Sequence, residues 1–201
     1  QVTDSYTSAV WYAARRAGVA LPLPHTVELQ VHKVAADADK ACQEAEATLA
    51  RAEGIRVLPA EAIARLAGSA NQVLFGAGEQ LLAVGEISRS VYVIVSGKAL
   101  GTHVDETGST GSIYFGADEV LGVTSLARAQ ASDTRVVALT DVAALRIPGD
   151  VVAQALHDHP SLSNQFARIW QARAEVLRRS AQQANEVTAS EAALDGSKLS
   201  G

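Results

Sequence analysis

The sequence contains no methionine and a single cysteine, Cys42, among its 201 residues. One cysteine excludes an internal disulfide and a cysteine-based zinc site, and it fits a reducing compartment. Because position 1 is Gln1 and a helical pattern is already under way in the first residues, we expect this chain to be a fragment of a longer protein.

Basic residues are also scarce, with 17 Lys and Arg against 22 Asp and Glu and a formal net charge of -5. Neutralising nucleic-acid phosphates requires clustered Lys and Arg, so this balance argues against nucleic-acid binding. Arg178 and Arg179 are the densest basic pair, and we interpret them as part of a solvent-facing helix surface.

Long apolar runs are missing as well. None approaches the roughly 18 residues that a membrane-spanning helix needs, and no secretory signal opens the chain. If the parent protein is a membrane protein, we expect its spans to lie upstream.

Catalytic signatures are absent from the sequence. There is no phosphate-binding Gly-x-x-x-x-Gly-Lys loop, no nucleophile elbow, and no plausible base for Cys42. His157, Asp158 and His159 resemble a metal cluster, but residues two apart on a helix point to different faces, and histidines in a last turn suit the helix dipole. We therefore predict that the chain is not an enzyme and has no metal site.

The first 58 residues mix helical and extended patterns. Thr3 or Asp4 can cap a helix that Gly18 ends, and Pro22 and Pro24 prevent its continuation. Apolar and polar residues alternate over residues 27–31, which predicts a strand. Residues 37–53 are rich in Ala and Glu with a thin apolar face, and they indicate a connecting helix.

After a short helix that opens at Pro59, brief β-rich runs follow one another with glycine between them. Short strands at such spacing predict an antiparallel sandwich or roll. The predicted strands are residues 73–75, 80–84, 91–95, 99–104, 112–115, 135–139 and 143–147.

Helices close the chain. Asp150 can cap a helix that ends before Pro160, and a longer helix begins near Ser161 with an apolar stripe along one side. From about Ser180 large apolar residues are few, so we expect a flexible tail. The predicted fold is α+β, an antiparallel, jelly-roll-like β-roll with flanking helices, preceded by a small helix-strand segment.

The turns of the roll carry a family resemblance. They comprise Gly78-Glu79, Gly85-Glu86, the run Tyr92-Val93-Ile94-Val95-Ser96-Gly97, and Phe115-Gly116. In this order, followed by two helices, they resemble the cyclic-nucleotide-binding domain of catabolite-activator-type regulators, kinase regulatory subunits and gated channels. Gly97 suits a hairpin turn with positive φ, and Tyr92 and Ile94 supply buried faces of a central strand.

In that family a loop and short helix between two late strands hold the ligand. The usual pattern is Gly-Glu-x-x-Leu followed by Arg-Ser-Ala or Arg-Thr-Ala. The resemblance implies that helix amides and the arginine bind the cyclic phosphate and that the glutamate accepts the ribose 2′-hydroxyl. The matching candidate ligand-binding residues are Leu121, Gly122, Val123, Thr124, Ser125, Ser132, Asp133, Thr134 and Arg135.

Two of the chemical positions depart from the family pattern. Val123 occupies the glutamate position, and Ser132-Asp133-Thr134 replaces the arginine triplet. Arg135, on the opposite strand face, and Arg128, on a loop tip, are better interpreted as surface residues. We therefore expect weak binding of cAMP or cGMP and no other cofactor.

Trp170 has two interpretations. On the final helix it can close over a purine, or it can pack beside Phe166 and Ile169; the apolar stripe favours core packing.

The opening segment has a resemblance of its own. The pattern Ala17-Gly18-x-x-x-Pro22-x-Pro24, between a helix and a strand, is similar to the end of the cytoplasmic vestibule of small-conductance mechanosensitive-type channels. A bacterial cyclic-nucleotide-gated subgroup of that superfamily carries its nucleotide-binding domain directly after the vestibule. The resemblance implies residues 1–34 as vestibule end, 35–58 as connecting helix, 59–180 as cyclic-nucleotide-binding-like domain and 181–201 as flexible tail.

The function that follows is that of a regulatory domain of an oligomeric ion channel. The resemblance implies identical subunits as partners, typically in a heptamer, the channel's own upstream membrane domain, and a position on the cytoplasmic side of the bacterial inner membrane. The alternative is a ligand-independent structural or docking module of the same channel. A transcription regulator is disfavoured, because the residues after the long final helix are too few and too polar for a helix-turn-helix.

Overall fold

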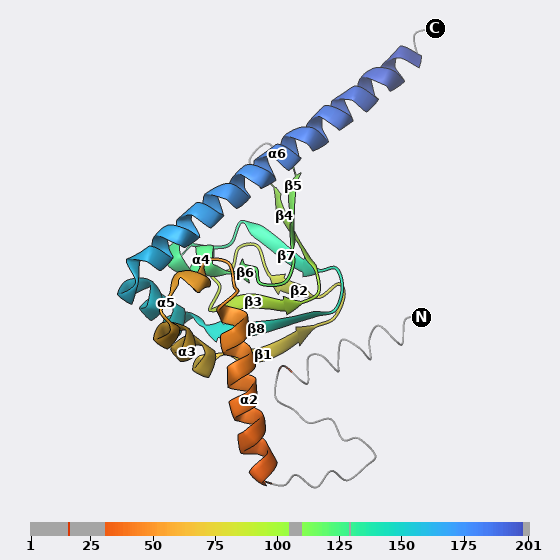
Figure 1. The fold of residues 1–201 in the computed structure, drawn as a ribbon. Coiled ribbons are helices and arrows are strands. Elements are labelled where there is room, and N and C mark those ends of the chain that lie inside the picture. Colours follow the sequence, from red (N-terminus) through yellow and green to blue (C-terminus); the bar gives the residue numbers. More distant parts are fainter. Residues whose placement is uncertain (1–15, 17–30, 105–109, 129, 199–201) are drawn as a thin grey trace, which may run out of the picture.

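The computed structural model describes residues 16, 31–104, 110–128 and 130–198. Two antiparallel sheets lie face to face, and helices cover one of them (Figure 1). The predicted antiparallel roll with flanking helices is therefore confirmed. The predicted helix before Gly18 and the strand at 27–31 fall almost wholly outside the described residues, and Val31 is the first residue of a helix.

Each sheet has four strands. The first has the order β1-β8-β3-β6, and the second has the order β2-β7-β4-β5. All seven predicted strands are present: residues 99–104 coincide with β4, and the other six differ from the observed strands only at their ends. The strand β6 was not predicted, because two residues show no periodicity. The first sheet comprises β1 Asn71–Phe75, β8 Val142–Pro148, β3 Ser90–Ser96 and β6 Val120–Leu121; the second comprises β2 Gln80–Leu82, β7 Thr134–Ala138, β4 Ala99–Val104 and β5 Thr110–Phe115.

The first sheet is buried on both faces because its apolar residues belong to two clusters. Val93 packs in the cluster that the sheet shares with the helices, whereas Ile94 packs in the cluster between the sheets. Successive side chains of a strand point to opposite faces, so both kinds of residue on β3 must be apolar. The first sheet thus lies between the helices and the second sheet and contributes to both cores.

Six helical elements surround the roll within the described residues. The short helix after Pro59 is confirmed, and the connecting helix lies four to six residues earlier than predicted. The elements are α2 Val31–Leu49, the 3-10 helix η1 Ile55–Val57, α3 Ala60–Ser69, α4 Val123–Arg128, α5 Gly149–Asp158 and α6 Pro160–Lys198. Within this part of the chain, no helix combines the length and the apolar character that crossing a bilayer requires.

Two helix ends differ from the sequence predictions. Pro148 is the N-cap of α5 and makes no side-chain cap bond, so Asp150 does not cap the helix; it lies in the first turn, where a negative charge suits the helix dipole. The last helix does not end near Ser180 but continues through Lys198. Its Ala, Gln and Glu residues favour helix, and extension of an established helix needs no apolar face of its own.

α6 lies against the edge strand β5 (Figure 1). A Cβ atom at Gly111 would stand 2.3 Å from the carbonyl oxygen of Leu177, so only glycine permits this approach. The Ser112 amide donates a hydrogen bond of 2.8 Å to Ser180 Oγ. These contacts place the middle of α6 along one open side of the roll.

A residue from the N-terminal segment also contacts the roll. Arg16 donates two hydrogen bonds to the carboxylate of Glu79, at 2.7 and 3.1 Å, and one of 2.9 Å to the Leu74 carbonyl. Its guanidinium lies 5.0 Å from the ring centroid of Phe75. Arg16 therefore contacts both the end of β1 and the turn between β1 and β2.

Candidate functional site

A cavity of about 400 Å³ lies between the roll and α6. Its walls come from three sources: strands of the second sheet, the segment from Leu121 to Thr134 that includes α4, and one side of α6. The lining residues from the strands are Leu82, His103, Ile113, Phe115 and Val136, and those from α6 include Trp170, Arg173, Ala174 and Leu177.

Seven of the nine predicted ligand-binding residues line this cavity. They are Leu121, Gly122, Thr124, Ser125, Ser132, Asp133 and Thr134. The segment that resembles the family's ligand-binding segment therefore borders this cavity.

Val123 and Arg135 do not line the cavity. Val123 is only 4% exposed and packs in the core between the first sheet and the helices, so it does not occupy a ribose-contacting position. Arg135 donates a hydrogen bond of 3.0 Å from Nε to Gln80 Oε1 at an exposed position, as expected of a surface residue. Arg128 is the last residue of α4 and does not lie on a loop tip.

The segment that carries α4 is bonded to the loop between β2 and β3. Ser125 Oγ donates to the Gln130 carbonyl at 2.6 Å and accepts from the Ser88 amide at 3.0 Å. The Ser132 amide donates to the Glu86 carbonyl at 2.9 Å. Gly122 has a φ of 84°, and a Cβ there would stand 2.9 Å from the Ser90 carbonyl oxygen, which is why the turn before α4 needs glycine.

Sequence reasoning missed the contribution of β4 and α6 to the cavity. His103 Nδ1 lies 2.9 Å from the carbonyl oxygen of Asp133, so β4 holds the start of β7 in place. Trp170 is half-buried and lines the cavity, in contrast to the core packing that the apolar stripe favoured. No sequence signal separated these residues from ordinary core and surface positions, because their meeting point depends on where α6 crosses the roll.

Arg173 connects the cavity wall to the end of the connecting helix. Its guanidinium donates to the Val120 carbonyl at 2.6 Å, to Glu53 at 3.0 Å and to Glu119 at 3.5 Å. It also lies 5.0 Å from the ring centroid of Phe115, and its side chain is 18% exposed. One side chain of α6 thus binds β6, the turn before it, and the turn after α2.

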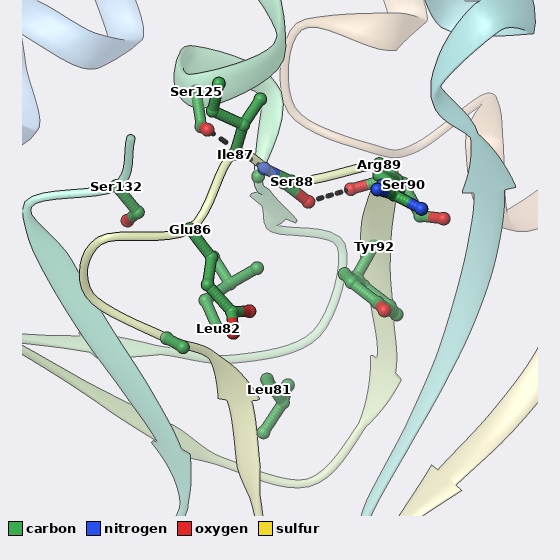
Figure 2. A pocket seen from close by; sticks show the side chains of 12 residues that line it. Leu81, Leu82, Glu86, Ile87, Ser88, Arg89, Ser90, Tyr92, Ser125 and Ser132 are labelled. Carbon is green, nitrogen blue, oxygen red and sulfur yellow. Dashed lines mark hydrogen bonds between the residues drawn. The ribbon is translucent and has the colours of Figure 1, made fainter. Parts of the chain in front are cut away.

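A second hollow, of about 800 Å³, lies on the other side of the same segment (Figure 2). It is bounded by β2, the loop that leads to β3, and β3 itself. It shares Leu82, Gly122, Ser125 and Ser132 with the first cavity, so the two spaces adjoin. The residues that belong to this hollow alone are Leu81, Ala83, Glu86, Ile87, Ser88, Arg89, Ser90 and Tyr92.

In the described part of the chain, no three His, Cys, Asp or Glu side chains are grouped so that they could hold a metal ion.

The comparisons with known proteins agree with this geometry. Residues 72–159 match the family model described as "Cyclic nucleotide-binding domain". No curated protein matches the sequence. Several hundred solved chains resemble it in structure, and at the low identities below this resemblance shows the fold alone.

Three of these structures illustrate the kinds of protein that share the fold. The regulatory domain of Toxoplasma gondii PKA with cAMP has a TM-score of 0.62 at 14% identity, over 68% of this chain and 52% of that one. The regulatory subunit of a cAMP-independent protein kinase A from Trypanosoma cruzi, bound to guanosine, has a TM-score of 0.53 at 18% identity, over 68% of this chain and 52% of that one. The sensor domain of the transcriptional regulator DNR from Pseudomonas aeruginosa has a TM-score of 0.55 at 13% identity, over 66% of this chain and 89% of that one.

The chain therefore spans about half the length of the two kinase structures.

Proposed function

Because residues 72–159 match the family model of the cyclic nucleotide-binding domain, we propose that this chain is a regulatory module that senses a small molecule in the cavity under α6. The observation that carries the proposal is the composition of that cavity. One wall is the segment around α4, which is bonded to the roll, and another wall is α6. A bound molecule would contact both.

Such an arrangement suits a sensor because a ligand shifts an equilibrium only if it contacts two elements differently in two states. The proposal requires α6 to shift relative to the α4 segment, which bonds of Ser88 and Ser125 hold to the roll. Arg173 joins α6 to Glu53 at the end of α2. A change in the position of α6 would thus reach the connecting helix.

The fold suggests a cyclic nucleotide as the first candidate ligand, at low affinity. A charge-assisted hydrogen bond to the phosphate and another to the ribose hydroxyl contribute about 1.5 to 3 kcal/mol each, and the residues that supply them in the family are replaced here by Ser132 and Val123. Their loss amounts to about two to four decades in dissociation constant.

Calorimetric titration of the 201-residue chain with cAMP and cGMP tests the proposal. We expect binding in the range from tens of micromolar to millimolar. Submicromolar affinity would contradict the weak-site prediction. No heat with any nucleotide or nucleoside at millimolar concentration would contradict the sensor itself and favour the ligand-independent docking module.

We extend the proposal to the parent protein, an oligomeric mechanosensitive-type channel with this module on the cytoplasmic side of the bacterial inner membrane. The support is the vestibule-like pattern at Ala17, Gly18, Pro22 and Pro24, followed by a nucleotide-binding-type domain. Heptameric assembly belongs to the same proposal. Sequencing the gene upstream tests it: two or more hydrophobic spans are expected there, and their absence would end the channel hypothesis.

A further inference from the structure

The turn between β1 and β2 holds two carboxylates in fixed positions. The Gly76 amide donates a hydrogen bond of 2.7 Å to Glu79 Oε2. The next amide, that of Ala77, donates one of 3.2 Å to Asp141 Oδ1. The two carboxylates lie close enough for Asp141 to repel the charge on Glu79. Because the backbone of one turn holds both negative groups, a cation beside them is favoured.

The end of β1 adds two groups that suit a planar cation, a backbone carbonyl at Leu74 and an aromatic ring at Phe75. The Phe75 ring is buried in the core between the sheets and contacts the ring of Tyr92 edge-on, at a centroid distance of 5.8 Å. The Leu74 backbone belongs to β1, which is paired with β8. The fold therefore sets the positions of both groups.

Arg16 fills this site with its whole guanidinium. Nη1 donates to Glu79 Oε2 at 2.7 Å and to the Leu74 carbonyl at 2.9 Å, and Nη2 donates to Glu79 Oε1 at 3.1 Å. The guanidinium carbon lies over the Phe75 ring, 5.0 Å from its centroid. An ammonium group cannot form the two-pronged contact and stack on a ring at the same time, so these groups select arginine over lysine.

The same chain is long enough to supply this arginine. α2 has 19 residues, so its axis is about 28 Å long, and it projects away from the roll (Figure 1). The 14 residues from 17 to 30 separate Arg16 from the start of α2. A chain of that length reaches at most about 50 Å. It can therefore return past α2 to the roll.

We propose that the β1–β2 end of the roll is a docking site for the N-terminal segment of the same chain, which it recognises by Arg16. The docking gives the residues before α2 a second connection to the roll, besides α2 itself. A movement of the roll then reaches the N-terminal segment without passing through α2. This inference goes beyond the sensor proposal, because the docking requires no ligand.

The experiment measures the distance between two nitroxide labels by pulsed electron paramagnetic resonance. Cys42→Ser removes the single native cysteine, and Ala14→Cys and Arg65→Cys carry the labels. Position 14 is two residues from Arg16 in the sequence, so its label reports on the segment that Arg16 anchors. Position 65 is exposed on α3 and reports on the roll. We expect one narrow distance distribution.

Substitutions at the contact test the recognition. Arg16→Gln and Glu79→Gln should each broaden the distribution at least about twofold, because a segment without its contact samples more positions. The double variant should be no broader than either single one, since both remove the same contact. Arg16→Lys should broaden it nearly as much as Arg16→Gln. Arg15→Gln, which removes the same charge one residue away, is the matched control and should keep the narrow distribution.

Dilution with an excess of unlabelled chain identifies the source of the arginine. A distance within one chain persists on dilution. Its disappearance would show that Arg16 of a second copy fills the site, and would overturn the assignment to the same chain. Equally broad distributions in the chain that retains Arg16 and in Arg16→Gln would overturn the docking itself. A narrow distribution retained in Arg16→Lys would overturn the selection of arginine.

Discussion

At the scale of single residues, the domain depends on side chains that divide between its two cores. Ile94 is 0% exposed and packs between the sheets, and Val93, also 0% exposed, packs against the helices. Tyr92 is half-buried with its ring edge toward Phe75, at a centroid distance of 5.8 Å. The prediction that this strand is buried on both faces is confirmed.

Ile94→Ala should lower the free energy of unfolding by about 2 to 5 kcal/mol, the range for a large-to-small change in a packed core. The loss arises because the sheets on either side cannot collapse fully into the space. Denaturant melts measure it. Tyr92→Ala, at a half-buried position, should cost less, and a loss under about 1 kcal/mol for Ile94→Ala would contradict the described packing.

Restoring the family's residues at Ser132 and Val123 should have different effects at the two positions. Ser132→Arg places a guanidinium at the border of both spaces, beside Glu86, and should raise cAMP affinity by about one to two decades. Val123→Glu buries a carboxylate among apolar residues and should cost at least about 2 kcal/mol of stability. Titration and thermal melts of each single variant check this, and a stable Val123→Glu protein that binds cAMP tightly would contradict the placement of Val123.

At the scale of elements, the contact between the N-terminal segment and the roll is an ion pair with a defined pH response. Burial by itself raises the pKa of Glu79, but hydrogen bonds from Arg16 and from the Gly76 amide outweigh it, so the pKa of Glu79 lies below its ordinary value. A carboxyl group with a lowered pKa in the folded state stabilises the fold above its unfolded pKa, about 4.3. That contribution is lost as the pH falls through the lower, folded pKa.

Arg16→Ala should therefore raise the pKa of Glu79 and reduce stability at neutral pH by more than at acidic pH. The mechanism is the loss of the two hydrogen bonds at 2.7 and 3.1 Å. An NMR titration of the Glu79 carboxyl, together with urea melts at neutral and acidic pH, measures both effects. Arg65→Ala, exposed on α3, is the control and should change neither quantity; an unchanged Glu79 titration in Arg16→Ala would contradict the contact.

At the scale of the whole molecule, Arg173 is the residue through which the cavity, the first sheet and the connecting helix meet. Its three hydrogen-bond partners are Val120 at the start of β6, Glu119 just before it, and Glu53 in the turn after α2, which lie 53 to 120 residues away in the sequence. Next to it, Gly54 permits the turn after α2 to approach α6 closely, because a Cβ there would stand 2.6 Å from the ring of Phe166. α2 and α6 project from the roll in different directions (Figure 1). The contacts of Arg173 and Gly54 join α6 to the turn after α2.

Arg173→Gln should release the end of α2 from α6. Glu53 and Glu119 lose their shared cation, and we expect faster amide hydrogen exchange over residues 50–57 and a stability loss of about 1 to 3 kcal/mol. Arg168→Gln, exposed on the same helix, is the matched control. The same exchange rates in both variants would show that Arg173 does not hold the connecting helix.

The sequence by itself determined the roll and seven of its eight strands, and the family resemblance indicated a segment that borders the cavity under α6. Alternating apolar residues and glycine turns are local signals, because the side-chain period of a strand and the positive φ of a turn leave their mark within a few residues. Such signals did not reveal β6, which has two residues, or the Pro148 cap of α5. Residues 121–125 and 132–135 were chosen from the family resemblance.

Only the tertiary structure decided which of those residues line the cavity. Val123 and Thr124 are neighbours in sequence, yet one packs in the helix-facing core and the other lines the cavity. Trp170 and Arg173 line the cavity because α6 crosses the edge of β5, which no local pattern records. The physical reason is that a binding site is made by contacts between distant segments, whereas periodicity and turn chemistry report only on a segment's own backbone.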